Sequence, residues 1–511
     1  MEHFVDENVV MRFYLERMNA GQIPFLRGKE QTQRQISEMI GQLLAARRMN
    51  ERIVVVKKLW KVLFEAAMSS LDRDKQGYDR IFSYFDEYVE FEELIFASDS
   101  FYRDHTLHCL WVYFLGEYVA HKESFSVLFQ SEKEESAFLQ SMGEIMPALL
   151  GPDTESGQKM AQACAGIRGV AENAAAIRCI AALTHDLGYP LKKIEKINKS
   201  IRRILPYYSV ESFGDFHFGY GNLNQPFIDT FFKILSTELN VTISVEDDRT
   251  EKVVRKLFEV KDGNLIAINA EHLDRLTEEE VQLLKKNVQL KNIWFSPVNA
   301  QIRTYNDFES YQHGIMSAFL LMKNLRAFQN LRMEIKEPTA NVDTEGYVNY
   351  VSKAAILSSI TLHTSDAFKI RRIDRCSFLT FIDELEEFSR ISRASQSREY
   401  VEEFCTSELY MDGGWFCVDF AFHNEKLDSL DPAKAFRGRC KRFLSLFDIP
   451  KLDERLKIRL RCIGDLPWNH SVYQLEIAKN HAKILVDGAE QEIPAFLKST
   501  QFYTSQEYAQ M

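Results

Sequence analysis

Histidine and aspartate side chains occur in this sequence at apolar, helix-like positions, where a polar group needs a partner. The stretch "ALTHDLGYP" (182–190) places His185 and Asp186 at the end of an apolar run. An imidazole and a carboxylate are costly to bury without partners. They are also ligands of divalent metal ions that activate water. The pair therefore indicates either a hydrogen-bonded core or a metal centre.

Four more residues of these two types lie on separate segments with helical, largely apolar patterning. They are His108 in "HCLWV", His313 in "YQHGIMSAFLL", His363 in "ILSSITLHT" and Asp383 in "FLTFIDEL". A single histidine on such a face is usually a hydrogen-bonded core residue. Several of them on separate helices, together with two aspartates, favour one shared site, because a bound metal ion would offset the cost of burial.

Two neighbouring residues compete for these ligand positions. His105 lies three residues before His108 on the same helical face, and is either a replacement for it or an outer partner. Asp366, three residues after His363, competes with Asp383. We prefer Asp383, because Asp366 lies in the loop-like stretch "TSDAFK".

The segments that would carry these side chains have helical periodicity. Apolar residues recur three to four positions apart over 1–100, 108–119, 174–186, 311–328, 350–364 and 377–392. This spacing predicts helices with one apolar face. We therefore expect a mainly α protein, with an N-terminal helical segment over 1–100 and a helical core over 101–400.

Two regions have a strand-like hydrophobic pattern in place of the helical one. Within 195–305, β-like runs such as "NVTISVEDD" and "GNLIAINA" flank a helix announced by Thr277 and Glu280, which have the spacing of a capping box. Over 401–511, the runs "WFCVDFAF", "LKIRLRCI", "VYQLEIAK" and "HAKILVDG" alternate like strands. We expect an α/β insertion in the first region and a C-terminal α+β lobe in the second.

Composition and charge narrow the class of protein. The chain has 511 residues, of which 45% are hydrophobic, and this is enough for two to four folded lobes. A formal charge of −11 gives no overall attraction for nucleic acid or an anionic membrane. The eight cysteines form no C-x-x-C pair and are typical of reduced core thiols.

The N-terminus lacks the basic residues of a signal peptide, and no uncharged stretch reaches the roughly 18 residues of a membrane span. We expect a cytoplasmic protein with no membrane partner and no strong attraction for nucleic acid. The sequence leaves open whether the chain forms a homo-oligomer.

The ordered set of segments over about 105–390 resembles the HD-domain superfamily of metal-dependent phosphohydrolases. "HCLWV" looks like the element of the first histidine, "LTHDLGYP" like the His–Asp doublet, and "FLTFIDELEEFSR" like the helix of the last aspartate. "YQHGIMSAFLL" and "ILSSITLHT" fit the two extra histidines that accompany a second metal ion. The resemblance implies an HD-type helical core and hydrolysis of a phosphate ester through metal-activated water.

The resemblance also implies a role for each candidate. The metal ligands would be His108, His185, Asp186, His313, His363 and Asp383, with Asp186 bridging two ions. The cofactor would be one or two divalent ions of Mn, Fe, Mg or Zn. The substrate would be a small phosphorylated molecule, a nucleotide or cyclic nucleotide, and phosphodiesterase action is favoured over nucleotidase or dNTP triphosphohydrolase action. The interval between the doublet and the next histidine is longer than usual in this family, so the insertion is expected to cover or shape the pocket.

Basic side chains close to the predicted ligands would contact the phosphate. Lys192 and Lys193 follow the doublet in "GYPLKK", and Arg390 follows Asp383. Ordinary solvated helix faces are the other interpretation. We predict all three as substrate contacts. The predicted catalytic residues are Asp186, His185 and Lys192.

Other interpretations remain open at this point. The aromatic stretch "FGDFHFGYG" (213–221) supplies rings for stacking a nucleobase, or simply forms core. A protein with this fold could also be a catalytically silent nucleotide sensor, in which a bound ligand moves the C-terminal lobe. A purely helical interaction scaffold would bind no metal at all.

Overall fold

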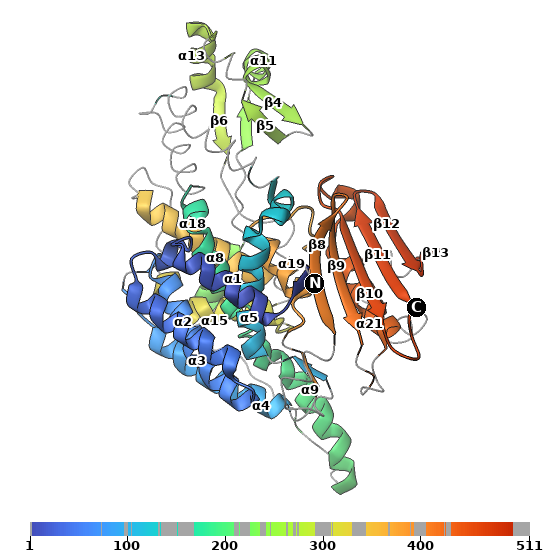
Figure 1. Cartoon of the computed structure of the whole chain (residues 1–511). Coiled ribbons are helices and arrows are strands. Elements are labelled where there is room, and N and C mark those ends of the chain that lie inside the picture. Colours follow the sequence, from blue (N-terminus) through green and yellow to red (C-terminus); the bar gives the residue numbers. More distant parts are fainter. Residues whose placement is uncertain are drawn as a thin grey trace.

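Helices dominate the computed structural model of the chain, and a mixed sheet lies at its C-terminal side (Figure 1). The structure describes residues 3–72, 74–96, 101–103, 105–130, 133, 151, 168–208, 214, 225–235, 242–245, 247–261, 264–268, 272, 275–291, 308, 310–329, 344–365, 368–388, 390–392, 405–423, 425 and 431–493. The prediction of a mainly α protein is confirmed. None of the helices in these ranges combines the length and apolar character that crossing a membrane requires.

The N-terminal helices form one side of the helical body. They are α1 (Glu7–Asn19), α2 (Glu30–Ala45), α3 (Met49–Met68) and α4 (Tyr78–Phe96), with a short 3-10 turn η1 (Pro24–Leu26). Asp6 caps α1, because its side chain accepts a hydrogen bond of 2.8 Å from the Val9 amide. Trp60 of α3 is fully buried, and its indole donates to the Leu183 carbonyl at 2.7 Å. The N-terminal helices therefore support the end of the helix that precedes the His–Asp doublet.

The central helices carry the candidate ligands. They are α5 (His105–His121), α8 (Ala174–Thr184), α9 (Tyr189–Ile204), α15 (His313–Asn324), α16 (Arg326–Gln329), α18 (Thr344–Leu362) and α19 (Phe378–Leu385), with a 3-10 segment η2 (Glu123–Phe129) after α5. Helix α5 is buried on all sides from His105 to Val119, as expected for a helix at the centre of a helical body. It packs against α8 and α19, and α18 packs against α8 and α15.

Two glycines allow the central helices to approach closely. A Cβ atom on Gly188 would lie 2.3 Å from the His313 carbonyl oxygen. The Gly188 amide donates a hydrogen bond to the Ser317 hydroxyl at 2.7 Å. A Cβ atom on Gly314 would lie 2.6 Å from the Ile360 carbonyl oxygen. Neither position has room for a larger side chain. The glycines therefore bring the start of α15 against the His–Asp doublet and against the end of α18.

The region 195–305 contains both helices and strands. Its elements are the end of α9, η3 (Leu205–Tyr208), α10 (Gln225–Leu235), β3 (Thr242–Val245), α11 (Asp248–Leu257), β4 (Phe258–Lys261), β5 (Asn264–Ile268), α13 (Glu278–Asn287) and β6 (Val288–Lys291). Strand β3 pairs with β6 and β4 with β5, both antiparallel. The capping box is confirmed: the Thr277 amide donates to the Glu280 carboxylate at 3.0 Å, and the Glu280 amide to the Thr277 hydroxyl at 3.2 Å.

The elements of region 195–305 lie at opposite ends of the helical body in Figure 1. In Figure 1, α11, α13 and β4–β6 lie at the top of the view, whereas α9 projects at the bottom. The expectation that the insertion covers the pocket stays a prediction, because much of 209–307 lies outside the described residues.

The C-terminal sheet contains the four predicted strands. Its strands, in spatial order, are β1 (Phe4–Val5), β8 (Thr406–Asp412), β9 (Trp415–Phe422), β10 (Ile458–Gly464), β11 (Val472–Ala478), β12 (His481–Val486) and β13 (Ala489–Gln491). Strands β9 and β10 are parallel and are connected through α21 (Pro432–Leu446) and the 3-10 turn η5 (Ile449–Lys451); the other pairs are antiparallel. Alternate residues of β10 are buried, in agreement with its sequence pattern. The edge strand β1 comes from the N-terminus and was not predicted.

One expectation about the helices is wrong. The helical pattern over 377–392 predicts a single helix, but α19 ends at Leu385, and Glu386 has an extended backbone with φ −77° and ψ 119°. Residues Arg390–Ser392 instead form β7, which pairs antiparallel with β2 (Phe101–Arg103). One hydrophobic core runs from the N-terminal helices into the sheet, and the division into lobes stays a prediction.

Candidate metal centre

The structure brings the predicted ligands together from five segments. The positions are His108 on α5, His185 and Asp186 after α8, His313 at the start of α15, His363 after α18, and Asp383 on α19. Two groups could each hold a metal ion, with ligand atoms within 4.8 Å of one another. These groups are His108, His185 and Asp186, and Asp186, His313 and His363. Asp186 belongs to both groups.

The two oxygens of Asp186 face different pairs of histidines. Its Oδ2 lies 3.5 Å from Nε2 of His185 and 3.8 Å from Nε2 of His108. Its Oδ1 lies 3.3 Å from Nε2 of His313 and 3.7 Å from Nε2 of His363. A carboxylate in this position can bridge two ions, one on each oxygen.

Asp383 lies beside the first group but is not a member of either group. Its Oδ1 lies 2.7 Å from Nε2 of His108 and 3.9 Å from Nε2 of His185. The side chain of Asp383 is 15% exposed and that of His313 is 21% exposed, whereas the other four predicted ligands are buried. Asp383 and His313 are therefore the most solvent-exposed of the predicted ligands.

Hydrogen bonds at Nδ1 orient two of the rings. Nδ1 of His185 lies 2.7 Å from the Ala182 carbonyl oxygen, and Nδ1 of His363 lies 2.5 Å from the Ile360 carbonyl oxygen. A carbonyl only accepts, so each Nδ1 carries a proton, and in the neutral form of each ring the lone pair is on Nε2. These lone pairs are available to a metal ion.

A carboxylate orients the third ring, and sequence reasoning missed it. Nδ1 of His108 lies 2.5 Å from Oε2 of Glu386, which is fully buried. Carboxylates often hold a metal-binding histidine in this way. The one available signal was spacing: Glu386 follows Asp383 by three residues, so both can face the same side of α19 and its last turn. The contact also accounts for the end of the helix, because the extended backbone at Glu386 lets its side chain reach His108.

The charges of the cluster fit a divalent cation. Burial lowers the pKa of His185 to about 4 and that of His313 to about 3, so both rings are neutral at pH 7. Burial alone would raise the pKa of Asp186, but the neighbouring His185 ring holds it well below its usual value. Within the described residues, all ion-pair partners of Asp186 are histidines. This buried carboxylate therefore lacks a permanent cation.

One buried nitrogen also favours a metal ligand role. Nε2 of His363 is inaccessible to solvent and has no hydrogen-bond partner in the described part of the chain. Such a group normally loses free energy on burial. A metal ion at this point would give the lone pair a partner.

The structure separates His105 from the cluster. Nδ1 of His105 pairs with the buried carboxylate of Glu92 at 2.7 Å, and its ring lies 4.0 Å from the Tyr189 ring. The Tyr189 ring in turn lies 4.7 Å from the His313 ring. Of the two candidates on α5, His108 therefore joins the ligand group. Tyr189, which the sequence did not single out, places its aromatic ring between the rings of His105 and His313.

The predicted substrate contacts lie outside the cluster. The Lys192 amine donates to the Ser310 carbonyl at 3.4 Å, and the Lys193 amine lies 4.6 Å from the centre of the Tyr189 ring. The backbone of Arg390 is in β7, and its side chain is not described. The competing Asp366 and, apart from Gly214, the aromatic stretch 213–221 lie outside the described residues.

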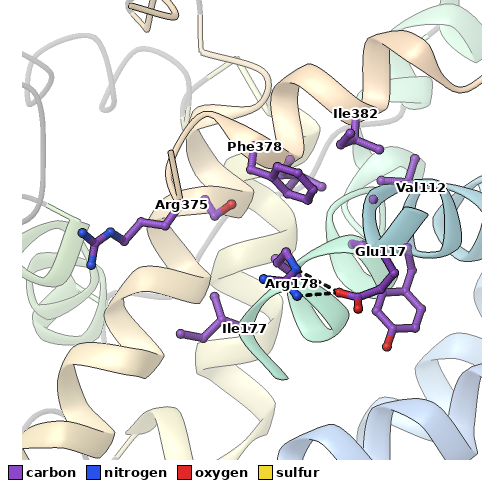
Figure 2. A pocket seen from close by; sticks show the side chains of 13 residues that line it. Val112, Glu117, Ile177, Arg178, Arg375, Phe378 and Ile382 are labelled. Atoms are coloured by element: carbon purple, nitrogen blue, oxygen red, sulfur yellow. Dashed lines mark hydrogen bonds and ion pairs between the residues drawn. The ribbon is translucent and has the colours of Figure 1, made fainter. Parts of the chain in front are cut away.

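A second polar group occupies a small cavity between the same helices (Figure 2). The Arg178 guanidinium lies 2.7 Å and 2.9 Å from one oxygen of the buried Glu117. Apolar residues such as Val112 and Phe378 line the rest. In Figure 2 the Arg375 side chain points away from this ion pair. The Glu117 carboxylate at this cavity is therefore paired with a cation of the chain itself.

Comparison with protein-family models, with curated proteins and with solved structures finds no match to this chain. The interpretation of the site therefore depends on its own geometry. That geometry shows a buried histidine and aspartate cluster that could hold a metal ion.

Proposed function

We propose that the chain is a metal-dependent phosphohydrolase with an HD-type helical core, acting on a phosphate ester of a nucleotide or cyclic nucleotide. The observation that carries the proposal is the position of Asp186, with one oxygen facing each pair of histidines. Two divalent ions, when bound there, would lower the pKa of a water molecule and stabilise charge on the phosphoryl group.

The residues of the chain have separate tasks in this proposal. His108, His185, Asp186 and Asp383 hold one ion, and His313 and His363 hold the second with Asp186. The carbonyl groups behind His185 and His363 keep their Nε2 atoms unprotonated and aimed at Asp186. Water and substrate enter past the partly exposed Asp383 and His313. No nucleophilic side chain is required.

The substrate would bind on the side of the cluster where His313 and Tyr189 lie. Tyr189 lies against His313, and the Lys193 amine lies over the Tyr189 ring. A phosphate at the cluster would find this amine nearby, and the ring offers a face to a planar base. Lys192 would contribute by leaving the Ser310 carbonyl. Phosphodiesterase action is favoured, because the resemblance of the binuclear ligand set is to diesterases.

A substrate panel tests the proposal. Cyclic mono- and dinucleotides, nucleoside mono- and triphosphates and a chromogenic diester are each assayed with Mn²⁺, Mg²⁺, Fe²⁺ and Zn²⁺. We expect hydrolysis by the wild type, and a fall of roughly 10³-fold or more in His185→Ala and Asp383→Ala. Arg461→Met, which breaks an ion pair on the C-terminal sheet, is the matched control and should keep its rate. Inactivity of the wild type on the whole panel would sink the hydrolase proposal.

A nucleotide sensor is the second candidate. It is favoured by the packing of α19, which carries Asp383, against the C-terminal sheet: the rings of Phe381 and Phe416 lie 5.7 Å apart. A ligand at the cluster could therefore act on the sheet. Nucleotide binding with Mn²⁺ but without product would support the sensor. An interaction scaffold, the third interpretation, predicts that the protein binds no metal.

A further inference from the structure

The residues around Asp383 face two sides in turn. Asp383 and Glu386 face α5, where each contacts one nitrogen of His108. Glu384 and Glu387, each one residue further along, face α21 instead. Asp383 and Glu384 lie in the last turn of α19, whereas Glu386 and Glu387 follow its end, so the two sides are set partly by the helix and partly by the extended backbone after it.

Two arginines of α21 hold the second side. Nε of Arg442 lies 2.5 Å from Oε1 of Glu384, and Nη2 of Arg439 lies 2.9 Å from Oε1 of Glu387. Arg439 is nearly buried, and its guanidinium lies 4.1 Å from the centre of the Phe420 ring on β9. Each arginine thus ties an acidic neighbour of the metal-site residues to the C-terminal sheet and its helix.

The segment before α19 is tied to the same lobe through its backbone. The Ile370 amide donates to the Leu446 carbonyl at 2.8 Å, and the Asp448 amide donates to the Ile370 carbonyl at 3.0 Å. The Asp453 amide donates to the Arg371 carbonyl at 2.7 Å. The chain between His363 and Asp383 is therefore held by the C-terminal lobe, as is the turn that follows Asp383.

We propose that Arg439 and Arg442 are positioning residues for the metal centre, which set Asp383 and Glu386 against His108 from the C-terminal lobe. The inference rests on the proposed metal-dependent function. Neither arginine is a ligand, and each acts through the carboxylate that it holds. Displacing α21 would move a ligand and the carboxylate that orients a second ligand together.

Metal affinity of the full-length, metal-stripped protein tests this inference. Mn²⁺ is titrated in and followed by electron paramagnetic resonance, which separates free from bound ion. We expect Arg439→Met and Arg442→Met each to raise the Kd of the ion beside Asp383 by about tenfold, the lower end of the range for loss of an outer partner. Arg442→Lys keeps the charge and should restore the Kd to within about twofold, which a general loss of stability would not allow.

Arg461→Met is the matched control. Arg461 also pairs with a buried carboxylate of the C-terminal sheet, since its Nε lies 2.8 Å from Oδ1 of Asp419, but within the described residues neither side chain forms a hydrogen bond or ion pair with α19. Its Kd should stay at the wild-type value. Should Arg439→Met fail to fold, the more exposed Arg442 pair carries the same test.

The possible failures are distinct. A wild type that binds no Mn²⁺ removes both the proposed function and this inference. A wild type that binds Mn²⁺, with Arg439→Met and Arg442→Met unchanged, removes only the positioning role. Equal weakening in Arg461→Met would also remove it, because the effect would then follow stability and not contact with α19.

Discussion

Two buried carboxylates in the helical body, Asp186 and Glu117, have different partners. Glu117 faces the Arg178 guanidinium at 2.7 Å, and this permanent cation holds its pKa below the usual value although burial alone would raise it. Asp186 faces histidines, and burial keeps the pKa of His185 and His313 at about 4 and about 3. The first carboxylate is paired with a cation of the chain, and the second lies beside the neutral rings of His185 and His313.

The difference separates a structural ion pair from a cluster that could hold a metal ion. A carboxylate paired with arginine loses little by being buried, because the opposite charge is covalently part of the protein. A carboxylate among neutral imidazoles needs a cation from solution, and the imidazoles supply lone pairs for that cation. Burial of an acidic residue does not by itself indicate a metal site. The kind of partner that faces the carboxylate is the informative feature.

The largest expected effect comes from removing the charge of Asp186. Asp186→Asn keeps the size of the side chain but should lose the bridging ligand, and with it bound metal and activity. We expect the rate on the best substrate to fall roughly 10³-fold or more. Elemental analysis and a rate assay on protein purified without chelator measure both effects. Metal content equal to that of the wild type would show that Asp186 is not a ligand.

The matching change at Glu117 should affect stability and not metal. Glu117→Gln leaves the Arg178 guanidinium next to a neutral amide in a largely buried place. We expect the free energy of unfolding to fall by about 2–3 kcal/mol, less than for a fully buried pair because Arg178 is 22% exposed. Chemical denaturation measures the loss, and elemental analysis should find unchanged metal. A variant that loses metal would break the contrast between the two carboxylates.

A smaller effect should appear in the pH dependence of the metal-free protein. The pKa of His185 is lowered from 6.5 to about 4 by burial. Below pH 6.5 the unfolded chain takes up a proton that the folded chain does not, so stability falls as the pH drops toward 4. His185 alone contributes about 2 kcal/mol of loss by pH 5.

Urea unfolding at several pH values, with chelator present, checks this prediction. His121, beside Glu117, has a pKa lowered to about 4 by burial and contributes in the same window, so His185→Gln is compared with the wild type. The variant should have a flatter profile between pH 7 and pH 5. Identical profiles would mean that His185 is not held neutral by burial.

The sequence singled out the candidate ligands that the structure brings together, because each signal was local. His108, His185 and Asp186 stand out as polar residues in apolar helical runs, and the helices carry them to one point. Strand alternation predicted β9 to β12 for the same reason. The capping box at Thr277 requires only four consecutive residues and was found in full.

The missed features depend on contacts between distant segments. Glu386 orients His108 across 278 positions of sequence, and its own neighbourhood reads as an ordinary acidic helix end. The helix was expected to continue to 392 because the apolar period continues, whereas α19 ends where Glu386 turns toward α5. In the sequence, Arg439 and Arg442 resemble the solvated basic residues of an ordinary surface helix. Their role becomes visible only in the structure, where α21 lies beside α19.

The first strand has a consequence for the order in which the protein is completed. Phe4 pairs with Glu408 and Val5 with Ser407. Strand β1 can therefore pair only after β8 has been synthesised, when about four fifths of this sequence has been made. Closing so long a loop is slow compared with forming local helices. Until then the free edge of β8 is open to pairing with other chains. The two residues of β1 thus cover an edge of β8 that would otherwise be open to pairing with other chains.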